Sequence, residues 1–194
     1  MAVRKIFYAN DPKLRQKAKK VKDFGPHLKK LADDMLETMR QANGLGLAGP
    51  QIGVMQRIFV VEIPEDSEDP NRGQSYAIVN PEFTQLSPEM EEGQEGCLSI
   101  PNWYGLVNRH QWVQVKAKDV YGRNIKLNAD GLLARAFQHE YDHLNGVLFI
   151  DHISDKEKLW QVLPEEEASA EQTDEENTKE TVPLTLEPMA TPTA

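Results

Sequence analysis

The chain has 194 residues, of which 39% are hydrophobic and 27% are charged, so it is long enough for one well-buried core. Cys97 is the only cysteine, which excludes an intramolecular disulfide, and no apolar run approaches the length of a membrane span. The first six residues lack the apolar core of a signal peptide, which together with the single cysteine predicts a reducing cytoplasm and no membrane partner. From the chain length we expect a single domain.

The first predicted element is an amphipathic helix over residues 28–43. Pro26 precedes leucines and methionines at helical spacing, and Asn43 with Gly44 ends the pattern, so the apolar side chains are assigned to the core. Residues 44–51 follow with the sequence GLGLAGPQ, in which three glycines permit close approach of another backbone.

The middle of the chain predicts antiparallel strands. Residues 57–63 are mostly apolar and are bounded by Pro64 and an acidic loop over residues 65–73, which is typical of a buried strand. Residues 77–81 predict a second, short strand. Apolar and polar residues alternate over residues 113–118, and a turn at residues 121–124 leads into residues 125–127, which predicts a hairpin.

Cys97 lies in residues 95–99, EGCLS. A lone cysteine is most often a small buried hydrophobe, and the other interpretations are a reactive thiol or a metal ligand. Gly96 before it and Ser-Ile-Pro after it predict a tight, extended segment, in which a backbone N–H beside the sulfur can point at a metal ion bound by that sulfur.

The most informative stretch is QHEYDH at residues 138–143, within a helix predicted over residues 132–145 that Gly146 terminates. His139 and His143 project from nearly the same side of this helix, and Glu140 lies about a quarter-turn away. Two imidazoles at this spacing can bind one metal ion while the carboxylate carries a proton, and a third ligand must come from elsewhere in the chain. The elements together predict an α+β fold with antiparallel strands packed around a central metal-binding helix.

These three segments, in this order, resemble the motifs of peptide deformylases. That family carries a Gly-hydrophobic-Gly-hydrophobic-Ala-Ala-x-Gln-like loop, then Glu-Gly-Cys-hydrophobic-Ser, then Gln-His-Glu-x-Asp-His-hydrophobic-x-Gly, and residues 44–51, 95–99 and 138–146 match them. The one departure is Gly49, where the family usually has alanine. We expect the missing methyl group to loosen the loop slightly and to leave Gln51 in place.

The resemblance implies a metal-dependent hydrolase that removes the formyl group from the N-terminal formylmethionine of newly synthesised polypeptides and releases formate. Cys97, His139 and His143 would bind one divalent metal ion, with water in the fourth position. Glu140 would act first as base and then as acid, while the Gln51 amide and the Leu98 backbone N–H stabilise the oxyanion. A thiolate with two imidazoles suits zinc and ferrous iron alike; the family favours Fe²⁺, with Zn²⁺, Ni²⁺ or Co²⁺ able to occupy the site.

The resemblance also indicates substrate contacts at Gly44, Leu45, Gly46, Arg109 and Leu132. The competing interpretation of Leu132 is ordinary core packing, and that of Arg109 is an exposed salt bridge. Arg135, one turn before His139, is expected to pair with Glu95. The remaining histidines are not expected to bind metal: His27 and His110 should be exposed, and His152 lies too far along the chain.

Two other classes remain open. His-Glu-x-x-His also marks zinc endopeptidases, but the position of their third histidine is Phe149 here, and the downstream glutamates, Glu157 and residues 165–167, belong to a solvated charged stretch. The other alternative is a metal-binding protein without activity, against which the presence of Glu140 argues.

The end of the chain is acidic. A last helix is predicted over residues 154–163, and residues 164–194 contain nine acidic residues and one lysine, so they carry −8 of the net charge of −9 and leave about −1 for residues 1–163. We therefore expect a catalytic domain over residues 1–163 and a disordered tail over residues 164–194. Because ribosomal RNA repels an acidic extension, we expect transient proximity to ribosomes without tight C-terminal docking, and no direct nucleic-acid binding.

Overall fold

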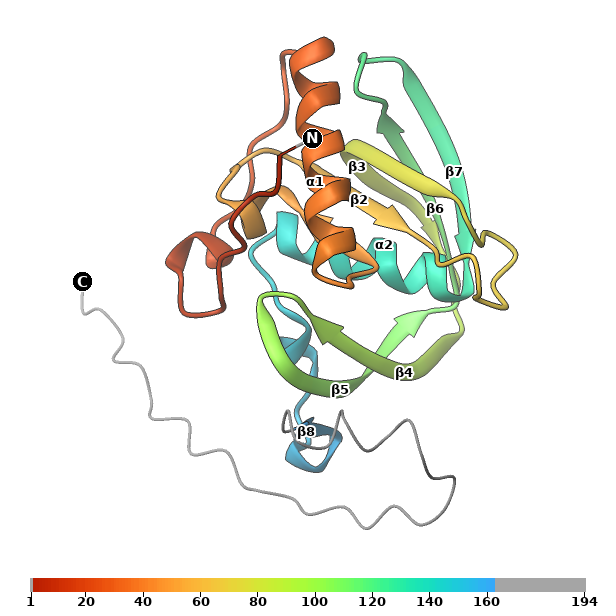
Figure 1. Cartoon of the computed structure of the whole chain (residues 1–194). Helices are drawn as coiled ribbons and strands as arrows, with labels where there is room; N and C mark the ends of the chain where they lie inside the picture. Colours follow the sequence, from red (N-terminus) through yellow and green to blue (C-terminus); the bar gives the residue numbers. More distant parts are fainter. Residues whose placement is uncertain (1, 163–194) are drawn as a thin grey trace, which may run out of the picture.

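The computed structural model describes residues 2–162, so the tail predicted over residues 164–194 lies outside the described residues (Figure 1). This part of the chain forms two α-helices, eight β-strands and four short 3₁₀ helices. The α-helices are α1 (Pro26–Gln41) and α2 (Gly131–Leu144). The strands are β1 (Gly46–Ala48), β2 (Ile58–Glu62), β3 (Ser75–Leu86), β4 (Met90–Cys97), β5 (Ile100–His110), β6 (Trp112–Lys118), β7 (Asn124–Asp130) and β8 (Leu159–Gln161). The 3₁₀ helices are η1 (Pro12–Arg15), η2 (Gly49–Ile52), η3 (Phe149–His152) and η4 (Lys156–Lys158).

The described strands pair in two antiparallel sheets. Five strands lie in the order β1-β2-β3-β6-β7, and three lie in the order β4-β5-β8. Helix α2 contacts strands of both sheets, and in Figure 1 it crosses the middle of the molecule with β4 and β5 below it. The predicted α+β fold, with antiparallel strands packed around a central helix, is therefore confirmed.

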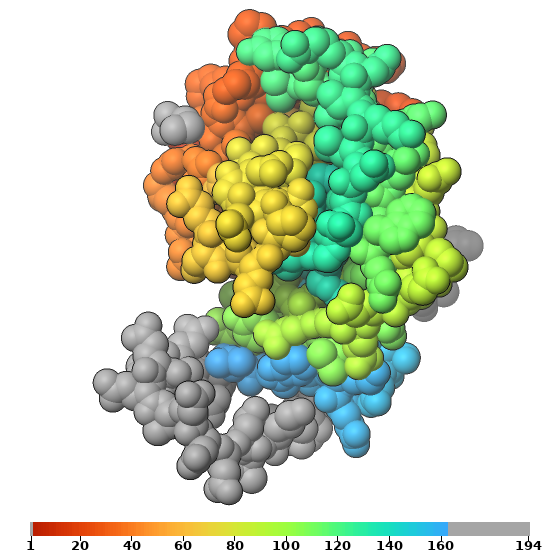
Figure 2. Space-filling view, turned by 90° about the vertical axis from the view of Figure 1, so that its right-hand side faces the viewer, coloured from red at the N-terminus to blue at the C-terminus, as the bar shows by residue number. Residues whose placement is uncertain are grey.

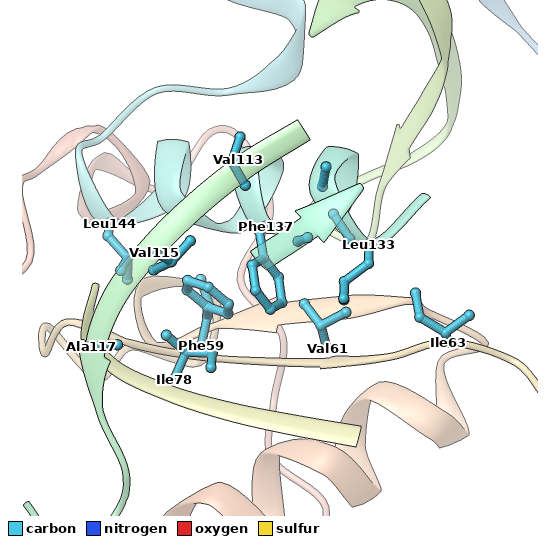
Figure 3. Packing of buried hydrophobic residues seen from close by; sticks show 14 of the residues in the cluster. Phe59, Val61, Ile63, Ile78, Val113, Val115, Ala117, Leu133, Phe137 and Leu144 are labelled. Carbon is cyan, nitrogen blue, oxygen red and sulfur yellow. The ribbon is translucent and has the colours of Figure 1, made fainter. Parts of the chain in front are cut away.

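Strand β2 is buried on both faces, which explains its continuous apolar run. Phe59 and Val61 face α2 and pack with Phe137, whose ring centroid is 5.5 Å from that of Phe59 (Figure 3). Ile58 and Val60 belong to the second cluster, which includes the buried face of α1. Burying each such side chain stabilises the fold by roughly 1.5–3 kcal/mol, so this strand fixes the positions of both helices.

The acidic loop between β2 and β3 holds one end of α2. Asp69 accepts a hydrogen bond from the backbone N–H of Leu132 at 3.1 Å. That N–H lies in the first turn of the helix, where donors lack partners within the helix and a negative charge is favourable. Figure 2 shows this loop, coloured yellow, on the surface beside the teal segment that leads into α2.

The predicted helix over residues 28–43 and the hairpin over residues 113–127 are confirmed as α1 and as β6 with β7. The strand over residues 77–81 is much longer than expected, because the first part of β3 pairs with β2 and the rest pairs with β6. Pro81 lies where the pairing with β6 shifts register, a place where a missing N–H is tolerated.

The predicted last helix over residues 154–163 is wrong. The chain forms the short η4 there, and then β8 pairs with β5 through Trp103, Tyr104 and Gly105. The free edge of β5 offers backbone hydrogen bonds that outweigh the local helical pattern. Within residues 2–162, no helix combines the length and the apolarity needed to cross a membrane.

Candidate metal centre and active site

Two distant segments bring together three side chains that can bind a metal ion. Helix α2 carries His139 and His143 one turn apart, and β4 ends at Cys97, where its pairing with β5 becomes irregular. One ligand atom from each residue lies within 4.8 Å of the other two, and the Cys97 Sγ is 3.3 Å from the His143 Nε2. The structure thus places the sulfur and both rings around one point.

The surroundings of His139 fit a metal ligand. Its Nδ1 lies 2.9 Å from Glu95 Oε2. Because an ionised carboxylate can only accept, Nδ1 carries a proton, which leaves Nε2 as the ring atom that would bind a metal ion. Burial lowers the pKa of His139, but Cys97 and Glu95 outweigh it and raise the pKa well above its ordinary value. A ring between two negative groups lies where a cation is favoured.

His143 differs from its neighbour. Burial, together with the positive charges of His139 and Arg109, holds the pKa of His143 well below its ordinary value, so the ring is neutral, the form that binds metal. Its Nε2 faces Cys97, and its buried Nδ1 has no hydrogen-bond partner among residues 2–162. A soft sulfur with two imidazole nitrogens is a donor set that suits zinc or ferrous iron, so the residues present fit a divalent transition metal.

Glu140 is a buried carboxylate beside this cluster, with 3% of its surface exposed. Burial raises its pKa to about 7, the charges of Glu95 and Asp142 act in the same direction, and His139 opposes them. Its Oε2 has no hydrogen-bond partner within the described part of the chain. A carboxyl group with a pKa near neutrality and a free oxygen can both accept and release a proton.

Gln51 approaches the cluster from η2. Its Oε1 accepts a hydrogen bond from the Ala48 backbone N–H at 2.7 Å, which turns the amide nitrogen toward Ser99 Oγ at 3.2 Å and Cys97 Sγ at 3.6 Å. Leu98 lies in the turn directly after Cys97 and lines the same cavity. Ser99 was not predicted as a partner of Gln51, because a serine in a loop carries no signal of its partner.

The glycines of residues 44–51 are explained by what surrounds them. A Cβ added at Gly46 would lie 2.2 Å from Glu140 Oε1, and one added at Gly44 would lie 2.6 Å from the Leu98 side chain. At Gly49 a Cβ would lie 2.7 Å from the Val54 carbonyl oxygen and 2.8 Å from that of Gln56. The expectation that Gly49 loosens the loop is therefore wrong: the space of the missing methyl group is filled by backbone, and the loop is closely packed.

A cavity of about 580 Å³ opens beside the cluster. Gly44, Leu45, Gly46 and Leu132 line it, together with Cys97, His139 and Glu140. Leu132 also packs against the core between α2 and the five-stranded sheet, so core packing is confirmed for this residue and its contact with substrate stays a prediction. Arg109 does not line this cavity.

Arg109 instead lies behind His139. It is 5% exposed and pairs with Glu95 at 2.8 Å and with Asp142 at 2.6 Å, so the alternative of an exposed salt bridge is also wrong. Burial alone would lower the pKa of Arg109 and raise that of Glu95, but their mutual pairing reverses both directions. The expected pair between Arg135 and Glu95 is confirmed at 3.0 Å.

The other histidines lie outside the cluster. His27 is exposed, as expected. His110, the last residue of β5, is only partly exposed, contrary to expectation, because its Nδ1 donates a hydrogen bond to the Ser87 carbonyl at 2.6 Å. His152 is exposed and lies 2.7 Å from Asp142. Phe149, the position of the third histidine in the endopeptidase pattern, is buried and stacks on His139 with ring centroids 6.2 Å apart.

Known proteins share the sequence and the fold of this chain. Residues 3–159 match the family model for polypeptide deformylase. The chain is similar to the peptide deformylase of Thermomicrobium roseum, with 49% identity over 172 residues, 88% of this chain and 97% of that relative. It is also similar to peptide deformylase 1 of Clostridium perfringens, with 45% identity over 152 residues, 78% of this chain and 99% of the relative.

Solved structures show the same fold. The crystal structure of peptide deformylase from Thermotoga maritima matches with a TM-score of 0.74 and 40% identity, over 80% of this chain and all of that one. The enzyme from Synechococcus elongatus, solved in complex with actinonin, matches with a TM-score of 0.71 and 42% identity, over 79% of this chain and 80% of that one. Since the similarity in sequence runs along nearly the whole length of the relatives and extends to the fold, this chain belongs to the peptide deformylase family, metal-dependent enzymes that remove the N-formyl group from nascent polypeptides.

Proposed function

We propose that Cys97, His139 and His143 hold one divalent metal ion, and that Glu140, Gln51 and the Leu98 backbone N–H act on the formyl group of an N-terminal formylmethionine. The observation that carries this proposal is the convergence of one sulfur and two ring nitrogens within 4.8 Å of one another, beside a buried carboxylate. A divalent metal bound by these residues supplies Lewis acidity, which strengthens water as a nucleophile and polarises a carbonyl group.

Glu140 moves the proton. Its carboxylate accepts a proton from the attacking water and then gives it to the departing amine, so that formate and a free amino terminus result. Its Oε1 lies against the backbone of Gly46, which also lines the cavity, so the proton carrier and the substrate's path adjoin.

Gln51 and Leu98 are proposed to stabilise the negative oxygen that forms during the reaction. The Ala48 N–H fixes the Gln51 amide before the substrate arrives, so its N–H groups need no reorientation as charge develops. The Leu98 N–H belongs to the turn directly after Cys97, which keeps it close to the same atoms.

The substrate is proposed to lie along Gly44, Leu45 and Gly46, with Leu132 in contact with the methionine side chain. Gly46 lies in β1, at the edge of the five-stranded sheet, where an extended peptide can add as a strand. In this proposal Arg109 does not contact the substrate, because both its partners are carboxylates behind His139.

Fe²⁺ is proposed as the working metal, with Zn²⁺, Ni²⁺ or Co²⁺ as substitutes. The thiolate of Cys97 supports a soft or borderline metal but does not discriminate among these ions. The test is anaerobic purification with metal analysis, followed by activity after reloading with each ion; highest activity with zinc would contradict the iron assignment.

The decisive experiment measures formate release from a short formyl-Met peptide and the metal content of the same preparations. Glu140→Gln should keep the metal and lose activity, and Cys97→Ser should lose the metal. Exposed Glu157→Gln is the matched control and should behave as wild type. Full metal retention in Cys97→Ser would support the endopeptidase alternative instead.

Newly synthesised N-formylmethionyl polypeptides are the proposed partners, which implies a cytoplasmic enzyme that meets ribosomes transiently. Residues 164–194, proposed as an acidic tail outside the catalytic domain, should not dock on the ribosome, because nine acidic residues repel RNA. Co-sedimentation with ribosomes that is lost when residues 164–194 are deleted would refute this part of the proposal.

A further inference from the structure

A chain of hydrogen-bonded charged groups runs from His139 to the protein surface. Glu95 accepts a hydrogen bond from the His139 Nδ1 at 2.9 Å, and Arg109 donates to both oxygens of Glu95 at 2.8 and 3.0 Å. The remaining terminal nitrogen of Arg109 donates to Asp142 Oδ2 at 2.6 Å. His152, at the end of η3, reaches the same oxygen of Asp142 at 2.7 Å and is exposed to solvent.

The direction of each contact follows from the carboxylates, which only accept. Arg109 donates through three nitrogens, two toward Glu95 and one toward Asp142, so its planar fork is fixed at both ends. His152 must donate through Nε2 to Asp142; the same nitrogen lies 3.4 Å from Arg109 Nη1, which can only donate, so Asp142 is the group that links the two. Asp142 is 19% exposed at its side chain, and His152 is its partner on the solvent side.

The same short helix supports His139 from a second direction. Phe149, the first residue of η3, stacks on the His139 ring with an interplanar angle of 24°. His152, the last residue of η3, ties this helix to Asp142 of α2. The contact between His152 and Asp142 therefore fixes both supports of the His139 ring: the guanidinium behind Glu95 and the phenyl ring of Phe149.

We propose that His152 is a positioning residue for the metal centre, acting through Asp142 and Arg109 on Glu95 and His139. This inference rests on the proposed role of His139 as a metal ligand. Without the His152 donor, Asp142 is free to turn toward water, the Arg109 fork loses its outer anchor, and the carboxylate that orients His139 is held less firmly. Groups that orient metal-binding histidines typically change metal affinity or activity by about 10–100-fold.

The test compares His152→Phe, which keeps a ring and removes the donor, with His152→Gln, whose amide can still reach Asp142. His27→Phe is the matched control, because His27 is a solvent-exposed histidine at the start of α1, 58% exposed at its side chain. Three quantities are measured anaerobically: the rate of metal loss to excess chelator, kcat and KM for a formyl-Met peptide, and the thermal unfolding of the metal-free proteins.

We expect His152→Phe to lose metal about 10-fold faster than wild type, in line with other residues that orient metal ligands. Its kcat should fall several-fold while KM stays within about two-fold, because His152 does not line the cavity. His152→Gln should recover most of both losses, and His27→Phe should match wild type. A double variant with Asp142→Asn should be no worse than Asp142→Asn alone, since His152 acts through Asp142.

Wild-type metal loss and kcat in His152→Phe would overturn the inference, as would equal defects in the Phe and Gln variants. Additive losses in the double variant would show that His152 does not act through Asp142. If wild type itself binds no metal, or His139→Ala retains it fully, the assignment of the metal ligands fails instead, so the two failures are distinguishable. Unfolding of the metal-free variants separates a positioning defect from general destabilisation.

Discussion

Gly46→Ala should disable proton transfer while leaving the fold intact. A Cβ at residue 46 would lie 2.2 Å from Glu140 Oε1 and 2.7 Å from the carboxyl carbon, whereas real Cβ contacts do not fall below 3.0 Å. The carboxylate must therefore move by about 0.8 Å, and a misplacement of about 1 Å costs on the order of 100-fold in rate. Gly46 has no positive φ, so alanine adopts its backbone conformation without strain.

The expected result is a kcat about 100-fold below wild type with unchanged metal content and a melting temperature within a few degrees of wild type. Formate release from a formyl-Met peptide, with metal analysis of the same preparation, measures it. Gly44→Ala is the matched control on the same loop: its Cβ would meet the far end of the Leu98 side chain at 2.6 Å, which can move, so kcat should fall only a few-fold. Equal losses in the two variants would refute the reasoning.

Three further predictions concern the surroundings of the site. Gly49→Ala drives a Cβ against two backbone carbonyls that cannot swing away, so we expect a loss of about 1–3 kcal/mol in the free energy of unfolding, measured by urea titration, with the metal retained; a wild-type midpoint would contradict it. Arg109→Leu leaves Glu95 buried without its bidentate counter-ion and should lower the free energy of unfolding, measured by the same urea titration, by about 3–5 kcal/mol. Exposed Arg123→Leu in the β6–β7 turn should lower it little. In the metal-free protein the pKa of Glu140 is raised from 4.5 to about 7, so its protonated form is favoured by folding, and this contribution is lost as pH rises from 4.5 through 7. Metal-free Glu140→Gln should therefore become more stable than metal-free wild type toward pH 8, by up to about 3 kcal/mol, with the difference shrinking toward pH 5; a difference independent of pH would exclude the raised pKa.

Residue patterns along the chain were enough to predict the helices and strands that repeat a local periodicity, and also the three segments of the candidate metal site. The spacing of His139 and His143 has one geometric meaning on a helix, and Cys97 was the only cysteine that could complete the set. The apolar run of β2 similarly required burial on both faces, and the structure supplies a helix on each side.

Tertiary structure alone decided the features that depend on partners far along the chain. Strand β8 exists because the edge of β5 is free, and Arg109 is buried because Glu95 and Asp142 both face it. Local propensity carries no record of such contacts, since hydrogen bonding, ion pairing and close packing between distant segments arise only once the chain has folded.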